Sequence, residues 1–313
     1  MTGTEQLGRG GLRMPRIEER HLVLCWIVLV LSGIVFGSSF SLFKLAAGSS
    51  RNPLGLAFWY SFLSAALISI PVLVRGHWSW LRGRVIGFCL LWGLVSTTLP
   101  TVLFFSAARV LPAGVLALAI AFVPIATFAG AIMLKRDQAS FRRCSGLGLG
   151  AMAALLVILP YARLPALEDV VWVLLPFGAV LCFAAEHLYY AIKAPDDAPV
   201  DGLLFVMFTC AALTLAPVLL LSSTFFLPNW PPAGGEYALL GVAAVTVLDY
   251  FLFAFLIARA GPVFTSQAAY FVTLAGIGWG MLLFGESHSV WIWSALVLAL
   301  VGVFLVQPRE AGS

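Results

Sequence analysis

The chain has 313 residues, of which 61% are hydrophobic and only 10% are charged, and its mean hydropathy is +1.01. Soluble domains typically carry about 25% charged residues, so this composition excludes a soluble globular protein and predicts that lipid surrounds most of the chain. The net charge of +4 does not indicate a nucleic-acid partner, because the basic residues lie in short segments between apolar runs.

The polar residues 1–21, which include four arginines, are expected to form a cytoplasmic N-terminal segment. The apolar run after them is too long for the core of a cleaved signal peptide, so we interpret it as a retained first helix. Nine more apolar runs follow, separated by proline, glycine and charged residues. A bilayer needs roughly 20 apolar residues per helix. We expect ten membrane-spanning helices, over residues 22–47, 54–74, 85–108, 112–134, 145–161, 169–192, 202–222, 236–258, 262–284 and 288–306.

The distribution of lysine and arginine predicts how these helices are oriented. With the N-terminus in the cytoplasm, 14 of the 18 basic residues lie in cytoplasmic segments, three lie in outer loops, and one, Lys44, lies inside a helix. Cytoplasmic segments of membrane proteins carry such an excess of basic residues. We therefore expect both termini in the cytoplasm, which requires an even number of helices, in a cell inner (plasma) membrane.

An internal repeat relates two parts of the chain at a constant offset of 150 residues. At this offset FFSAARVLPAGVLALAIAFVPIATFAGAIMLKRD overlaps FAFLIARAGPVFTSQAAYFVTLAGIGWGMLLFGES, so that Pro112 matches Pro262 and Gly130 matches Gly280. Each half contains five expected helices, an odd number, so the second half enters the membrane in the opposite sense. Inverted-topology repeats of this kind are typical of transporters that alternate access around a site near the bilayer midplane.

The predicted fold is therefore all-α and transmembrane, with ten helices arranged as two five-helix inverted-topology repeats. The first repeat is expected over residues 22–161 and the second over residues 169–307. Residues 308–313 are expected to form a cytoplasmic tail.

Several classes of function lack their sequence motifs. The five cysteines are scattered, with no CxxC motif or Cys/His cluster, so the sequence predicts no metal site and no cofactor. No GxxxxGK[ST] motif for ATP occurs, and neither does a Ser/His dyad, an aspartate pair or an HExxH motif of an intramembrane protease. We expect a protein that is not an enzyme and has no catalytic residues.

Three apolar segments carry a family signature. FGSSFSLFKLA in the first helix is similar to a first-helix motif of Trp-Gly-Ser followed by an apolar-Lys pair, with Phe36 in place of Trp; LPAGVLALAIAFVPIATFAGAIML and FVTLAGIGWGMLLFGE are similar to a fourth and a ninth helix. With them the chain resembles the EamA-like family of the drug/metabolite transporter superfamily, over roughly residues 22–307. It departs from the family at Tyr60, where Arg is common, and at Lys135-Arg136, where Gly-Glu is usual.

The resemblance implies uniport, exchange or proton-coupled export of small organic molecules. Across the family the substrates include amino acids, nucleobases, drugs and quaternary amines. We expect a secondary transporter that exports small organic metabolites such as amino acids or related amines by alternating access. Its expected partners are this substrate, the lipid bilayer and, where export is coupled, protons. The main alternative is a flippase of lipid-linked substrates with the same fold; an intramembrane enzyme and a non-transporting sensor or assembly factor are further alternatives.

Ionisable residues inside apolar helices are the first candidates for substrate binding, because they are costly in lipid and usually face a cavity. Asp249 lies near the middle of the eighth expected helix, beside Tyr250, and Glu186 and His187 lie in the cytoplasmic half of the sixth. Tyr190 shares a helix face with Glu186. Acids among aromatic rings favour a cationic or zwitterionic substrate. In the alternative interpretation, each acid only hydrogen-bonds to a neighbouring helix.

Other polar residues complete the predicted substrate-binding site. Lys44 lies toward the outer end of the first helix, and Thr98 lies in the third helix beside a proline. Ser266 and Tyr270 are four residues apart on one face of the ninth helix, and Gln267 adjoins that face. We expect the first, third, sixth, eighth and ninth helices to line a central polar pocket. Hydrogen bonds that hold helices together are the structural alternative for these residues.

Overall fold

The computed structural model describes residues 19–48, 51–76, 78–135, 140–162, 167–266 and 268–306. Within these ranges the chain forms helices and turns and no strand, as expected for the all-α class. The elements are, in chain order, α1 (Glu19–Ala47), α2 (Pro53–Arg75), α3 (Gly83–Gly93), the π-helical turn η1 (Leu94–Thr98), α4 (Leu99–Ala108), α5 (Ala113–Ile120), α6 (Val123–Met133), α7 (Phe141–Ala162), α8 (Leu167–Lys193), α9 (Val200–Leu221), α10 (Gly234–Ser266), α11 (Ala268–Phe284) and α12 (Val290–Val306).

The twelve α-helices of the described residues form ten helical segments, because two of the expected helices are each divided into shorter pieces. α3, η1 and α4 together form one apolar segment over Gly83–Ala108, and α5 and α6 form another over Ala113–Met133. Seven segments have the length and composition to cross a membrane, and three shorter apolar helices cover Cys144–Ala153, Ala268–Phe284 and Val290–Gly302. These lengths and compositions are those of a multi-pass membrane protein.

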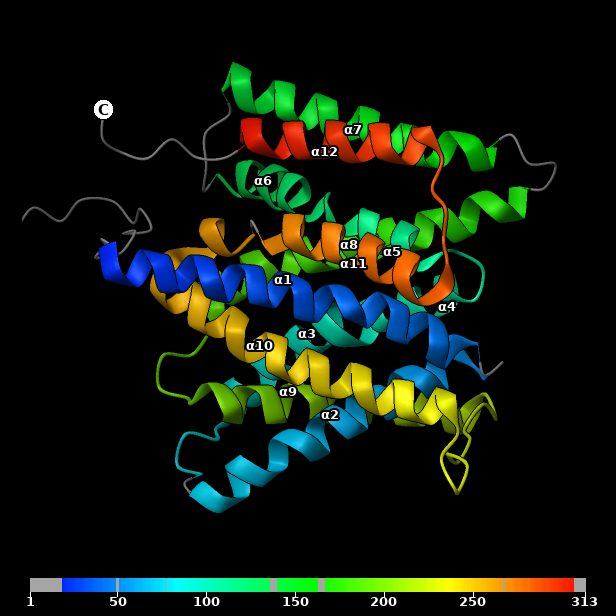
Figure 1. Cartoon of the computed structure of the whole chain (residues 1–313). Helices are drawn as coiled ribbons and strands as arrows, with labels where there is room; N and C mark the ends of the chain where they lie inside the picture. Colours follow the sequence, from blue (N-terminus) through cyan, green and yellow to red (C-terminus); the bar gives the residue numbers. More distant parts are fainter. Residues whose placement is uncertain are drawn as a thin grey trace, which may run out of the picture.

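The helices lie side by side in one bundle (Figure 1). α7 packs against α12 along one edge, and α2 packs against α9 along the opposite edge. Between these pairs α1 packs against α10 and α11, while α8 packs against α4 and α6. α1 begins and α12 ends at the same end of the bundle, as an even number of crossings requires (Figure 1).

The separation expected between the helices over residues 236–258 and 262–284 is wrong in position, because α10 continues through Gly261 and Pro262 and ends at Ser266. A proline removes one backbone donor and leaves the carbonyl one turn earlier without its helical partner, but in an apolar environment the remaining backbone groups are still best satisfied within the helix. The division of the third helix also has a local cause. Pro100 has no N–H to donate back along the helix, and in the π-helical turn before it the backbone N–H of Leu99 donates to the carbonyl of Leu94.

Glycine allows α1 and α11 to pack closely. A Cβ added to Gly37 of α1 would lie 2.8 Å from Ala275 Cβ and 2.9 Å from the backbone nitrogen of Gly276. A Cβ added to Gly33, one turn earlier, would lie 2.1 Å from Phe271 Cβ. Small residues at this spacing let the backbones of two membrane helices approach each other, and van der Waals packing then stabilises the pair.

α6 and α11 end in the same unusual backbone conformation. Lys135 follows the end of α6 with φ of 54°, and Gly285 follows the end of α11 with φ of 63°. Positive φ is uncommon for residues other than glycine, and it is a common way to end a helix. The two residues occupy equivalent positions in the 150-residue sequence repeat.

Candidate functional site

A cavity lies in the middle of the bundle and is lined by α1, α2, η1, α4, α5, α6, α8, α10 and α11. All five segments expected at the pocket contribute to it, and α2, α5 and α6 do so as well. Its lining consists of Ser32, Phe36, Phe43, Tyr60, Ser96, Thr101, Ile120, Val123, Phe183, Glu186, His187, Thr246, Asp249, Tyr250, Phe253, Thr265, Ala268, Ala269 and Val272. Of the ten residues expected to bind substrate, it therefore brings together Asp249, Tyr250, Glu186 and His187.

Glu186 of α8 is held by two neutral donors. The indole N–H of Trp92 donates to Glu186 Oε1 at 3.0 Å, and the hydroxyl of Tyr250 donates to the same oxygen at 3.2 Å. Only 4% of the residue is exposed. The edge of the Tyr250 ring packs on Trp92, with 5.9 Å between the ring centroids. The carboxyl group is therefore fixed at the meeting point of three helical segments.

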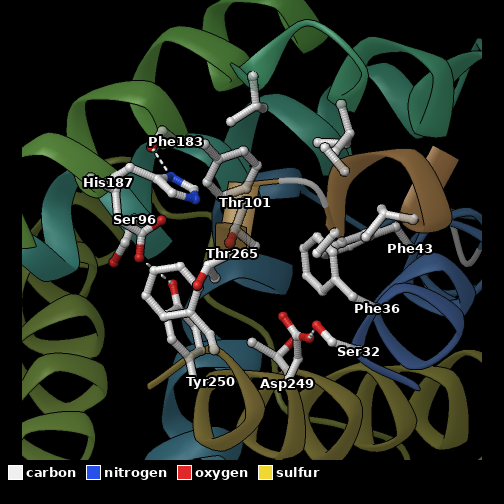
Figure 2. A pocket seen from close by; sticks show the side chains of 18 of the residues that line it. Ser32, Phe36, Phe43, Ser96, Thr101, Phe183, His187, Asp249, Tyr250 and Thr265 are labelled. Atoms are coloured by element: carbon white, nitrogen blue, oxygen red, sulfur yellow. Dashed lines mark hydrogen bonds between the residues drawn. The ribbon is translucent and has the colours of Figure 1, made fainter. Parts of the chain in front are cut away.

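Asp249 of α10 faces α1. The Ser32 hydroxyl donates to Asp249 Oδ1 at 2.5 Å, and both side chains line the cavity (Figure 2). Neither Asp249 nor Glu186 is paired with a lysine or arginine here, because none is among the described residues that line the cavity, and the Nδ1 of His187 is bonded to the carbonyl of Phe183. When ionised, the two acids make the cavity negative, and a bound cation can neutralise that charge.

His187 and Tyr190 lie one turn apart on α8, but only His187 is among the residues that line the cavity. His187 lines the cavity, and its Nδ1 lies 2.7 Å from the carbonyl oxygen of Phe183 (Figure 2). Since a carbonyl only accepts, Nδ1 carries the proton in this arrangement. Tyr190 is outside the cavity lining and packs its ring against Trp92, with 5.0 Å between centroids. It supports the residues that hold Glu186.

Of the other five candidate residues, Lys44, Thr98 and Tyr270 are not among the residues that line the cavity. Lys44 forms an ion pair with Glu286, with 2.8 Å between Nζ and Oε1, and Thr98 lies 3.5 Å from the hydroxyl of Thr214. Tyr270 of α11 packs partly buried against the apolar core. Ser266 is the last residue of α10, and Gln267 lies outside the described residues.

Glu286 joins three elements at one end of the bundle. Besides pairing with Lys44 of α1, its oxygens accept the backbone N–H groups of Ala113 at 2.7 Å and Gly114 at 2.9 Å, at the start of α5. His288 Nε2 lies 3.7 Å from Glu286 Oε2. Burial opposes ionisation of Glu286, but Lys44 and the two backbone donors outweigh it and lower the pKa of this carboxyl below its ordinary 4.5.

The sequence did not identify several residues that line the cavity. Tyr60 was noted only as a departure from a family pattern, and Thr246 lies one turn before Asp249 on the same face of α10. That spacing was a usable signal. Ser32 and the phenylalanines of α1 and α8 had none, because serine and phenylalanine are ordinary residues of packed membrane helices.

Comparison with known proteins gives a family match over part of the chain, and a fold. Residues 23–159 match the sequence model of the EamA-like transporter family, within the drug/metabolite transporter superfamily. No curated protein matches the chain. Among solved structures 17 chains match, and one of them, a crystal structure of a protein, has a TM-score of 0.60 and 16% sequence identity over 92% of this chain and 99% of that chain. At this identity the likeness shows the fold alone.

Proposed function

Residues 23–159 belong to the EamA-like transporter family, and from this we propose that the whole chain is a secondary transporter. It exports small organic cations or zwitterions, such as amino acids or related amines, across a cell inner (plasma) membrane by alternating access. Protons move in the opposite direction. Both termini lie in the cytoplasm, as the excess of basic residues in the expected cytoplasmic segments requires.

The observation that carries this proposal is the pair of acids in one cavity whose described lining residues include no lysine or arginine. Asp249 and Glu186 both line the cavity, and the hydrogen bonds they receive come from neutral groups of Ser32, Trp92 and Tyr250. A carboxylate that serves only to join helices gains most from a cationic partner. Carboxyl groups with neutral donors can instead accept a substrate ammonium or a proton in turn.

Aromatic rings around the acids favour an organic cation over a metal ion. Phe36, Phe43, Phe183 and Phe253 line the cavity together with Tyr250. A cation over an aromatic face gains roughly 0.5–2 kcal/mol, and alkyl groups on the same ligand pack against the rings. Within the described residues, no group of three histidine, cysteine or acidic side chains is placed to hold a metal ion.

Alternating access rests on the proposed two-fold relation between residues 22–161 and 169–307. Three observations support it. α1 packs on α10 and α11 as its counterpart α8 packs on α4 and α6, and Lys135 and Gly285 share a left-handed backbone at the 150-residue offset. Ser96 and Thr246, at the same offset, both line the cavity. An inverted repeat lets the two halves exchange conformations and so open the cavity to each side in turn.

Uptake into proteoliposomes against a panel of amino acids, nucleobases and quaternary amines, with and without a pH gradient, tests the proposal. Asp249→Asn and Glu186→Gln are expected to lower transport of the best substrate by about tenfold or more, because a hydrogen bond to a charged group contributes roughly 1.5–3 kcal/mol. Asp197→Asn, which removes an exposed acid, is the matched control. If both cavity variants transport normally at every pH, the acids are structural and the proposal is wrong.

A further inference from the structure

Besides the two acids, three hydroxyl side chains form a second polar cluster in the wall of the cavity. Tyr60 of α2, Thr101 of α4 and Thr246 of α10 all line it, and they are 4%, 4% and 2% exposed, respectively. The Tyr60 hydroxyl lies close enough to the hydroxyls of both threonines to interact with them. We call these three residues the hydroxyl cluster.

Thr246 is the member of the cluster that lacks a hydrogen bond. Its Oγ1 is buried and has no partner with hydrogen-bonding geometry among the described residues, although Tyr60 is near. Threonines inside helices commonly bond to a carbonyl of the preceding turn, as Thr209 and Thr127 do here. A buried hydroxyl without a partner is unfavourable, and such a group on a cavity wall is satisfied when a ligand supplies the partner.

The hydroxyl cluster lies a short distance from one of the two acids. Thr246 and Asp249 are three residues apart on α10, so they share a face and are separated by about 4.5 Å along the helix axis. Both line the same cavity. A ligand whose cationic group contacts Asp249 can therefore place a second polar group at Thr246 with a spacer of two or three carbon atoms.

The lining of the cavity favours a ligand whose second polar group is neutral, and among the proposed substrates this favours the amines over the amino acids. A carboxylate would need a positive partner, but no lysine or arginine occurs among the described cavity residues, and Lys44 is paired with Glu286. Two acids in the same cavity would also repel a carboxylate. Hydroxyl groups, in contrast, both donate and accept, and they suit a neutral group of the same kind.

We propose that the hydroxyl cluster is a second subsite of the cavity, which binds the hydroxyl group of an organic cation while Asp249 binds its ammonium group. The substrate class is then that of amino alcohols and their N-methylated forms. This proposal rests on the proposed function, because it requires that the cavity take up organic cations. The residue that determines the preference for a hydroxyl group is Thr246.

Pairs of cations that differ only by a hydroxyl in place of a methyl group test this proposal: choline with n-propyltrimethylammonium, and ethanolamine with propylamine. Their competition against transport by the full-length protein in proteoliposomes is measured. The wild type is expected to favour the hydroxyl member about three- to tenfold, the range for one neutral hydrogen bond. Thr246→Val, which keeps the shape and removes the hydroxyl, is expected to abolish the preference by weakening the hydroxyl member alone. Thr209→Val is the control and should retain the preference.

Each other outcome overturns the proposal in a recognisable way. Equal binding of both members by the wild type rejects the subsite and leaves the proposed transport of cations standing. Stronger competition by glycine betaine than by choline shows that the second group is a carboxylate. A retained preference in Thr246→Val places the hydroxyl elsewhere. If no member of either pair competes or is transported, both the subsite and the proposed cation transport are rejected.

Discussion

Glu286 accepts hydrogen bonds from three donors on two helices, although it lies in the segment between α11 and α12. α5 begins after Pro112, which provides no side-chain cap, so the first N–H groups of this helix depend on Glu286. A carboxylate at a helix N-terminus is also favoured by the helix dipole. One side chain from the second half of the chain thus fixes the start of a helix in the first half.

Glu286→Gln is expected to lower stability by about 1–3 kcal/mol at neutral pH, because it removes the charge that Lys44 and the α5 amides bind. The folded-state pKa of Glu286 is lowered, so its contribution is present above the ordinary pKa of 4.5 and is lost as the pH falls through the folded value. Thermal unfolding midpoints in detergent should therefore differ between wild type and variant at pH 7, and the difference should shrink as the pH falls below 4.5 through the lowered folded value. Asp197→Asn is the control, and a difference that does not shrink as the pH falls below 4.5 would contradict this role.

At the residue scale the sequence identified the acids more easily than their partners. Asp249 and Glu186 could be predicted as cavity residues because an ionisable side chain inside an apolar helix is costly unless it faces a cavity or partner. Lys44 satisfied the same argument but pairs with Glu286, which no local pattern indicates because the two are 242 residues apart. Ser32 had no such signal, since single hydroxyl residues are common in membrane helices, whereas Thr246 could have been found from its position one turn before Asp249.

At the scale of helices, the crossing of α1 and α11 depends on small residues. Gly37→Ala is expected to lower the thermal unfolding midpoint, at a cost of about 1–3 kcal/mol, because the added Cβ would lie 2.9 Å from backbone atoms of Val272 and Gly276. Gly278→Ala on α11 is the matched control: its Cβ would meet nothing within 4 Å, so the better helix propensity of alanine should leave stability unchanged or slightly raised. Equal effects of the two changes would refute the close crossing.

Hydropathy predicted the number and order of the helices, but it predicted the residues at which they begin and end less accurately. Runs of about 20 apolar residues are a strong signal because backbone groups in lipid must be satisfied within the helix. The same requirement explains the error at Pro262, where α10 continues to Ser266 instead of stopping. A proline is a reliable end signal only where water can take over the unsatisfied groups.

At the scale of the whole molecule, the proposed topology places the region before α7 in the cytoplasm. Cys144 near the start of α7 is exposed, whereas Cys25, Cys89 and Cys210 are buried and Cys182 is half-buried. A membrane-impermeant maleimide is therefore expected to label Cys144 in inside-out vesicles and not in right-side-out vesicles. Cys144→Ser should remove this labelling. Labelling of Cys144 from the outside would reverse the orientation inferred from the basic residues.

The two acids of the cavity lie on α8 and α10, and the residues that α1 to α6 contribute to it are neutral. The segment that matches the EamA-like family ends at residue 159, before both acids. The likeness to the family is therefore found in a part of the chain that contributes no charged residue to the cavity. If the two acids bind the substrate as proposed, substitutions in α8 and α10 would change the substrate without altering the segment that matches the family. The part of the sequence that carries the family likeness and the part that carries the charged residues of the cavity can therefore change independently in evolution.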